Sequence, residues 1–356
     1  MTVAASPSIF GFGGQTAKGT MATTWHRHKA LRANVGPRQV VQQFPPELGG
    51  GFAPTGAFKS MAYGAGIASL HPRLEDVLGW LIYGAVGQLS GTNEIEAATV
   101  YRHVFTPPDT PTDMKWMSIR EYIPGATSSD ELGTFILDAR AAGIKFDLAP
   151  GGLLATTHTF AGREPSIMED IDALGTYTWT WNAEYETYES VPLAHQGSLS
   201  LGGVAQSAAG VSVTLGNSFT APQDELIVGS PYPDDIMLLQ QVLQAQWVYK
   251  WQDHSLYQSI YSGTETADGS GYIDWSPVVH TGSFELIINS PTNITGASYP
   301  YRLRIYAPTM TWQCSGPPDL IGGDWLRLTF TGTAQDDSPT FQIELDNEVS
   351  TYTWPS

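Results

Sequence analysis

The sequence predicts a mainly β protein with two tandem strand-rich domains that each contain one helix. One strand pattern occurs twice, as GGLLATTHTFAG from Gly151 and as GGDWLRLTFTG from Gly322. Both halves also follow the order strand, helix and several further strands. Finally, 37 glycines, 24 prolines and 11% aromatic residues are typical of short strands joined by many turns.

The repeat extends beyond the strand itself. Each copy opens on a glycine pair, which is a turn signal, and the later copy then alternates apolar and polar residues as a half-buried strand does. The segments GIKFDLAPGG and PTMTWQCSGPPDLIGG precede the two copies in the same order. A duplicated unit explains this order. We therefore expect Phe160 to superpose on Phe330, and Ile144 on Met310.

In the first half, GAFKSMAYGAGIASL predicts an extended segment from Phe58 to Ile67. The next segment, HPRLEDVLGWLIYGAVG, predicts a helix with Pro72 in its first turn. Strands are then expected at MKWMSIREYI, TFILDA and GIKFDLAPGG. The helix prediction rests on an apolar stripe at helical spacing, formed by Leu74, Val77, Leu78, Leu81 and Ala85.

In the second half, VLQAQWVYKW is dense in apolar residues, but these alternate with Gln244, Gln246 and Lys250. A period of two predicts a strand and not a helix. DHSLYQSIYSG predicts a short helix between Asp253 as N-cap and Gly263 as its stop. GSFELII and YRLRIYA are predicted strands.

A length of 356 residues suits two domains of ordinary size, predicted at residues 37–175 and 176–356. Residues 1–36 are expected to form a basic arm. The formal net charge is −18, but residues 1–60 hold six Lys or Arg against one acid, Glu47, so the other residues carry −23. Uneven charge of this kind suggests that a basic arm lies on an acidic body.

The arm, around WHRHKALR, is expected to cross to a neighbouring copy of the chain. Trp25 is its predicted apolar anchor, and Arg27, Lys29 and Arg32 are expected to meet carboxylates. A disordered, solvated N-terminus is the alternative.

The chain contains no apolar run of about eighteen residues, so no membrane partner is expected, and no signal peptide is recognised at the N-terminus. The single cysteine, Cys314, cannot form an internal disulfide, and we expect it to be a buried small residue in a strand.

The search for catalytic, cofactor and metal motifs yields no candidate. GxSxG, P-loop and HExxH patterns do not occur. His26 and His28 are two residues apart, but no acid or cysteine lies within ten residues of them. DGSGYID, from Asp268 to Asp274, lacks the terminal glutamate of an EF-hand loop and predicts a hairpin turn. The acids at Glu184, Glu186 and Glu189 are expected to face solvent. We therefore predict no catalytic residue, no cofactor, no metal site and no enzymatic activity.

Long segments of the chain resemble a known family, the major tail tube proteins of long-tailed bacteriophages with two tube domains in one polypeptide. In the first half the resemblance lies in PRLEDVLGWLIYGAVG, MKWMSIREYIPG and GTFILDARAAGIKFDLAPGGLLATTHTFAGR. In the second half it lies in VSVTLGNSFTAPQDELIVGSPYPDDI, VLQAQWVYKWQDHSLYQSIYSG and GSFELII. Together these segments cover roughly residues 55–165 and 195–335.

The resemblance implies two tandem tube domains, each an antiparallel β-sandwich or barrel with one flanking helix. It also implies a structural subunit of the virion, made in the host cytoplasm. Six tube domains are expected per ring, so three copies of the chain would close one ring, and rings would stack into a tube for genome delivery. Its expected partners are further copies of itself, other tail proteins and, as non-specific cargo only, double-stranded DNA.

The acidic balance suggests a channel wall that repels phosphate, because DNA binds strongly to basic surfaces. Two other classes of protein stay open from the sequence. One is another virion ring protein such as a tail terminator, and the other is a carbohydrate-binding or glycosidase β-sandwich protein.

Overall fold

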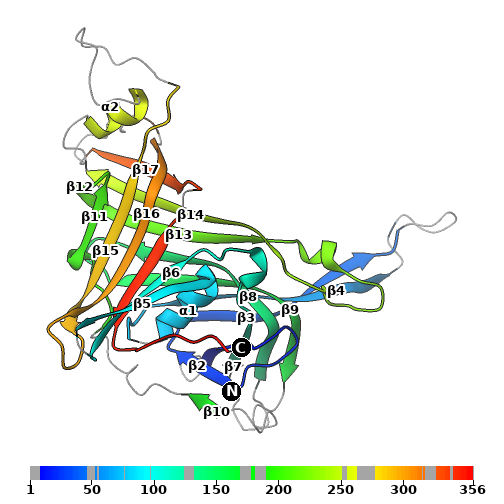
Figure 1. Ribbon diagram of the computed structural model, residues 1–356. Coiled ribbons are helices and arrows are strands. Elements are labelled where there is room, and N and C mark those ends of the chain that lie inside the picture. Colours follow the sequence, from blue (N-terminus) through cyan, green and yellow to red (C-terminus); the bar gives the residue numbers. More distant parts are fainter. Residues whose placement is uncertain are drawn as a thin grey trace, which may run out of the picture.

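The computed structural model describes residues 9–45, 53, 56–75, 77–96, 98–123, 132–168, 178–180, 190–250, 255–262, 277–314, 316, 326–336 and 340–355 (Figure 1). In these residues the chain is mainly β, with eighteen strands in one hydrogen-bonded sheet and two α-helices. The ladders are antiparallel, apart from a short parallel pairing of β2 with β10. The predicted fold class, mainly β and antiparallel, is confirmed.

The first half contributes nine strands and one α-helix to the described residues. Its elements are β1 (Ile9–Gly14), β2 (Thr24–His28), β3 (Arg32–Gln43), β4 (Ala57–Leu70), α1 (Val77–Val86), β5 (Gln88–Glu96), β6 (Val100–Thr106), η1 (Pro111–Asp113), β7 (Met117–Ile123), β8 (Leu132–Leu148) and β9 (Leu154–Met168). The helix is where the apolar stripe predicts it, although it begins five residues after Pro72. The residues expected to form two strands, TFILDA and GIKFDL, belong to the single strand β8, because bulges at Asp138 and after Ala141 bend this strand without ending it.

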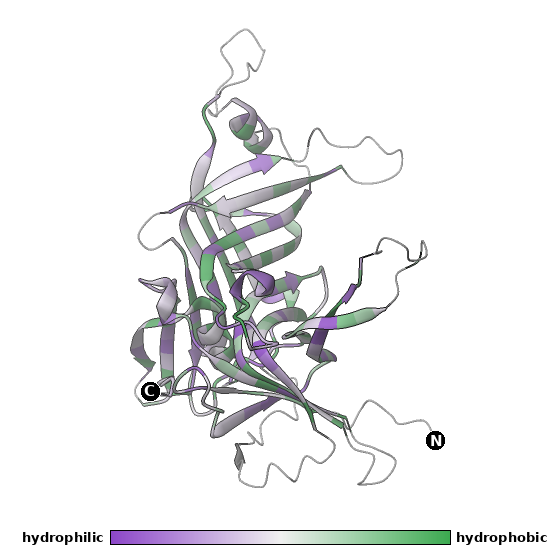
Figure 2. Ribbon diagram, turned by 90° about the vertical axis from the view of Figure 1, so that its right-hand side faces the viewer, coloured by the Kyte–Doolittle hydropathy of each residue, from purple (hydrophilic) through white to green (hydrophobic). Residues whose placement is uncertain are grey.

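The second half repeats much of this order. Its elements are β10 (Thr178–Thr180), η4 (Ala194–Gln196), β11 (Gly197–Leu201), β12 (Val204–Gln206), β13 (Ala208–Phe219), η5 (Pro222–Glu225), β14 (Leu238–Lys250), α2 (Ser255–Ser262), β15 (Thr281–Asn293), β16 (Pro300–Cys314), β17 (Arg327–Ala334) and β18 (Gln342–Asn347). The alternation along β14 is as predicted, since Trp247 and Tyr249 are buried while Gln246 and Lys250 are exposed. Figure 2 shows the same alternation of hydrophilic and hydrophobic residues along several strands.

The two duplicated strands occupy matching places in the sheet. β9 lies between β4 and β8, and β17 lies between β14 and β16. Phe160 is opposite Gly66 and Ala141, whereas Phe330 is opposite Trp247 and Cys314.

The second residue pair expected from the repeat is wrong. Matching Phe160 to Phe330 also matches Glu164 to Ala334, four residues further along each strand. Glu164 lies opposite Leu137 and Ala334 lies opposite Met310, so Met310 corresponds to Leu137 and not to Ile144. The strands are therefore equivalent, but the segments before them are matched at a different position, because the loops between the paired strands differ in length.

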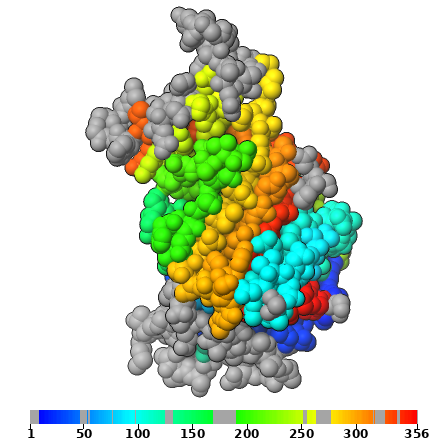
Figure 3. All heavy atoms as spheres, turned by 60° about the vertical axis from the view of Figure 1, so that its left-hand side comes forward, coloured from blue at the N-terminus to red at the C-terminus, as the bar shows by residue number. Residues whose placement is uncertain are grey.

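The two halves are joined through the sheet. Residues 143–148 of β8 pair with β13, and β18, near the C-terminus, pairs with β6 of the first half. Figure 3 shows the yellow and orange strands of the second half lying against the cyan β5–β6 region. Their buried residues form one apolar cluster that runs from Phe10 to Trp354. The domain boundary predicted at residues 175 and 176 lies outside the described residues.

The predicted basic arm is wrong for the residues that the structure describes. Residues 9–36 contribute β1, β2 and the start of β3, and β1 pairs with both β2 and β7. Phe10, Phe12 and Trp25 are each at most 2% exposed within the chain's own core. Burial of these rings in the chain's own core outweighs the positive charge that led us to expect an arm on a neighbouring copy, since each buried aromatic side chain contributes about 1.5–3 kcal/mol.

Candidate assembly surface

One face of the central strands carries uncharged polar side chains, because successive residues of a strand point to opposite faces of the sheet. Leu243, Ala245 and Trp247 of β14 are buried, while Gln244 and Gln246 point away from the core. The neighbouring strands continue this surface, which we call the amide–hydroxyl face. A shallow hollow of about 390 Å³ on it is lined by Ser212 and Thr214 of β13, Gln244 and Gln246 of β14, and Thr331 and Thr333 of β17.

The amide–hydroxyl face carries few charges. Lys145 forms an ion pair with Asp147, with the Lys145 Nζ 2.9 Å from the Asp147 Oδ1. Lys250 and Arg327 lie directly opposite each other where β14 pairs with β17. This face is therefore not net negative, unlike the acidic wall that the chain's overall charge led us to expect.

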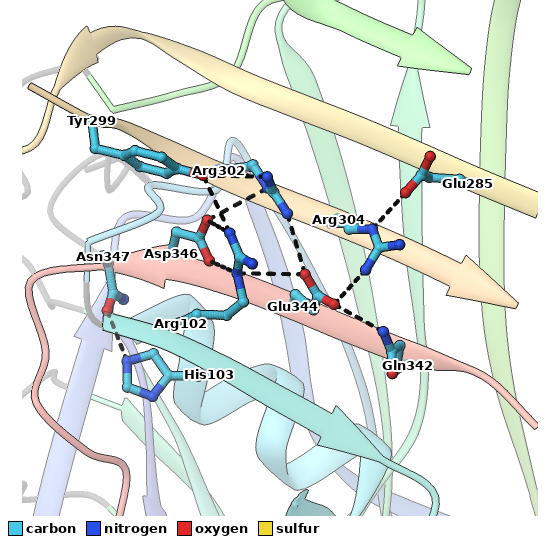
Figure 4. A network of polar contacts seen from close by, with 10 residues as sticks. All are labelled: Arg102, His103, Glu285, Tyr299, Arg302, Arg304, Gln342, Glu344, Asp346 and Asn347. Carbon is cyan, nitrogen blue, oxygen red and sulfur yellow. Dashed lines mark hydrogen bonds and ion pairs between the residues drawn. The ribbon is translucent and has the colours of Figure 1, made fainter. Parts of the chain in front are cut away.

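A balanced network of ion pairs continues the polar surface over β15, β16, β18 and β6 (Figure 4). The Nε of Arg102 lies 2.8 Å from Oδ1 of Asp346, and the Nε of Arg304 lies 2.7 Å from Oε1 of Glu285. The hydrogen bond from Arg102 to Asp346 raises the pKa of the Arg102 guanidinium above its ordinary value.

Glu344 stands at the centre of this network. Its carboxylate oxygens lie 3.3 Å from Nη2 of Arg302 and 2.5 Å from Nη1 of Arg304. Burial acts to lower the pKa of Arg304, but its bonds to Glu285 and Glu344 outweigh burial and raise it. Three guanidinium groups thus meet three carboxylates, and the network joins β18 to strands of both halves.

The two halves meet where residues 143–148 of β8 pair with β13, a contact that we call the joint. Amide side chains from the second half close it. The Nδ2 of Asn217 donates hydrogen bonds of 2.8 Å to the carbonyl oxygens of Ala85 and Ala141. Gln241 adds bonds from its Nε2 to the carbonyls of Ala85 and Val86, at 3.1 and 3.2 Å. The last carbonyls of an α-helix have no partner within the helix, so these amides cap the end of α1.

The close approach of β13 to β8 depends on a glycine. A Cβ on Gly143 would lie 2.7 Å from the carbonyl oxygen of Leu215, nearer than real Cβ contacts come. Gly143 therefore lets Leu215 and Ile144 pair across the joint.

The connection between β13 and β14 is fastened to the first half around Asp138, which is fully buried with a positive φ of 54°. Its carboxylate pairs with Arg163 and accepts a hydrogen bond of 2.6 Å from the Gly19 N–H. Arg163 Nε in turn donates to the carbonyl of Pro233 at 2.8 Å. Arg140 donates to the carbonyl of Ile236 at 2.5 Å.

Three histidines of the first half have strongly lowered pKa values. Burial lowers the pKa of His26 to about 4, of His28 to about 4 and of His158 to about 3. His26 stacks on Trp80 with ring centroids 4.9 Å apart, and His28 contacts the carbonyl of Lys29 at 3.0 Å. Within the described part of the chain, no three His, Cys, Asp or Glu side chains are arranged to hold a metal ion.

The structure also locates the single cysteine considered in the sequence. Cys314 ends β16 but is only half-buried, and its Sγ lies 3.1 Å from the carbonyl of Gly316. The expected full burial is thus wrong, because the strand ends there. The segments with Glu184, Glu186, Glu189 and Asp268–Asp274 lie outside the described residues.

Sequence reasoning missed the residues of the joint. Asn217 follows Val211, Val213 and Leu215 at the same spacing of two, so it occupies a core-facing position. Because buried polar groups are hydrogen-bonded, an amide in that position signals a specific partner. The partner itself, Ala85, is 132 residues away and has no signal in the sequence.

The chain matches no known protein-family profile, and comparison with curated proteins finds no similar sequence. None of the helices in the described residues is both long and apolar enough to cross a membrane.

Proposed function

We propose that the chain is a non-enzymatic structural subunit of the tail tube of a long-tailed bacteriophage, which assembles as trimeric rings stacked around a channel for genome delivery. One observation carries the proposal. Two halves with the same strand arrangement are joined side by side through β8 and β13, and the amide–hydroxyl face runs across the joint.

The joint is a head-to-tail contact, because the two halves use different strands to make it. Contacts of this kind produce a ring when the rotation between units closes, and an open filament when it does not. In a ring of six units built from chains of two equivalent units, every second contact between units lies within one polypeptide. Three copies would then complete the ring.

The amide–hydroxyl face suits a channel wall for double-stranded DNA. Binding to DNA is driven by release of counterions when basic residues neutralise phosphates. Hydroxyl and amide groups neutralise no phosphate, and Lys145 is already paired with Asp147. The proposed wall therefore offers phosphate few cations, with Lys250 and Arg327 confined to one end of the β14–β17 pairing. This weak adhesion takes the place of the acidic wall expected from composition.

Negative-stain electron microscopy of the purified protein at high concentration tests this function. The proposal predicts hollow filaments made of stacked rings. Single rings that never stack would favour the alternative virion ring protein. A protein that stays monomeric, and that binds a glycan array, would contradict the proposal.

A further inference from the structure

The two helices are covered differently, although they follow equivalent strands. The end of α1 is closed by Asn217 and Gln241 of the second half. The corresponding side of α2 faces a hollow of about 590 Å³, lined by Tyr257, Ile260 and Tyr261 of the helix and by Val279, Cys314 and Gly316. We call this hollow the α2 groove (α2 is at the top of Figure 1).

Register within the sheet shows that the α2 groove is the counterpart of the closed joint. Ala141, whose carbonyl accepts the Asn217 amide, lies opposite Phe160. Cys314 lies opposite Phe330 in the same way. A glycine follows two residues after Ala141 and after Cys314 in the sequence, Gly143 within β8 and Gly316 beyond the end of β16.

The same register identifies the segment that would fill the groove. Val35 of β3 lies opposite Gly66, and Val211 of β13 lies opposite Trp247, so these two valines are equivalent. Along β13 this register continues unbroken to Asn217, which lies opposite Gln241. Along β3 it continues to Val40, and a bulge then places Val41 opposite Lys59, so the outer β3–β4 hairpin corresponds to the β13–β14 hairpin although Val41 and Asn217 are not equivalent residues. Val41 is 57% exposed.

The outer part of the β3–β4 hairpin projects away from the body of the molecule (Figures 1 and 2). The rings of Phe44 and Phe58 near its end contact each other in a tilted arrangement with centroids 5.0 Å apart, and they are 47% and 41% exposed. A two-stranded ribbon with exposed apolar side chains is marginally stable in water by itself.

The inner part of the β3 edge is already closed within the chain. The Val35 N–H donates to the Glu121 carboxylate at 2.7 Å, and the Thr134 hydroxyl donates to the Val35 carbonyl at 2.5 Å. Pro37 has no N–H to offer. A partner strand is therefore directed to the outer residues of β3, from Gln39 onward.

We propose that the α2 groove binds the outer β3–β4 hairpin of a second copy of this chain, with Val41 of that copy placed between α2 and Cys314. The contact resembles the joint that β13–β14 makes with α1 and β8 inside the chain, but it uses the outer residues of β3, whereas the joint uses residues 211–216 of β13. The exposed apolar side chain of Val41 suits a groove that is lined by Ile260, Tyr261 and Val279. This inference rests on the proposed ring assembly and names its contact between chains.

The native cysteine provides the test. In the variant Val41→Cys, mild oxidation with diamide should link the new thiol to Cys314 of another copy, since disulfides form only when the two Cα atoms come within about 7 Å. We expect covalent dimers and trimers on non-reducing gels, with the 41–314 peptide pair identified by mass spectrometry. Adding Cys314→Ser should abolish the products. Val204→Cys is the matched control because Val204, 63% exposed, lies on β12 away from the hairpin.

A second variant, Tyr261→Lys, places a charge in the groove at a side chain that is 44% exposed, so the fold should persist. In the Val41→Cys background it should reduce the 41–314 product at least tenfold. Microscopy of the same samples separates the two proposals. Tubes or rings that form without the 41–314 product would overturn the inference and leave the proposed function standing. Oligomers that carry the 41–314 cross-link but form no tubes and no rings would support the inference and contradict the proposed function. An equal yield from Val204→Cys would show random collision and overturn the inference.

Discussion

The side-chain amide of Asn217 donates a 2.8 Å hydrogen bond to the carbonyl of Ala85, and so joins the second half of the chain to the end of a first-half helix. We predict that Asn217→Ala lowers the free energy of unfolding by about 1–3 kcal/mol, because it leaves buried carbonyls without a donor. Urea denaturation followed by tryptophan fluorescence measures the change. Asn34→Ala is the control, since the Asn34 side chain is exposed and bonds Arg38 on the surface. Equal effects would contradict the account of the joint.

Asp138 carries a buried charge and a left-handed backbone conformation at the same position. Asp138→Ala should cost about 3–5 kcal/mol of stability, since it leaves the mostly buried Arg163 guanidinium without its carboxylate. Asp138→Asn should cost clearly less, because asparagine tolerates positive φ and its oxygen can still accept from Gly19. Thermal denaturation of both variants gives the comparison. A larger loss in Asp138→Asn than in Asp138→Ala would contradict the roles given to the backbone conformation and to the Gly19 hydrogen bond.

Stability should fall with acidification below about pH 6.5. The unfolded chain protonates its histidines near that pH, whereas His28 and His158 stay neutral in the folded chain until about pH 4 and 3. The unfolded state therefore binds more protons in this window, and each of the two histidines lowers stability by up to about 1.4 kcal/mol per pH unit.

The comparison of His158→Gln with the parent protein, by urea denaturation between pH 7 and 4.5, tests that dependence. The variant should show a shallower fall in stability than the parent. Phe160→Leu perturbs the neighbouring core without a titrating group, so it should lower stability by a similar amount at every pH. An unchanged slope in His158→Gln would refute the assignment.

Gly79 reverses the usual effect of glycine in a helix. Replacement by alanine ordinarily stabilises a helix by about 1 kcal/mol, but a Cβ at position 79 would overlap the ring of Tyr352. Gly79→Ala should therefore destabilise the protein, and calorimetry should show a lower Tm. The control is Gly91→Ala, where the added Cβ meets no atom within 4 Å. A Tm at or above that of the parent for Gly79→Ala would mean that Tyr352 does not pack there.

Local patterns in the sequence identified much of the sheet. The alternation around Trp247 identified β14, and the stripe from Val77 to Ala85 identified α1, because burial imposes a period on each element. The error over residues 9–36 arose from giving charge more weight than the alternating Phe10 and Phe12. No sequence pattern could show that Asn217 meets Ala85, since that contact depends on how two distant elements pack.

Cryo-electron microscopy of the assembled protein tests the central claim most directly. The account predicts a tube whose cross-section contains six similar units from three chains, with Gln244, Gln246 and Thr331 facing the channel. A tube with these side chains on its outer surface would contradict the account, as would a protein that stays monomeric at every concentration and salt condition.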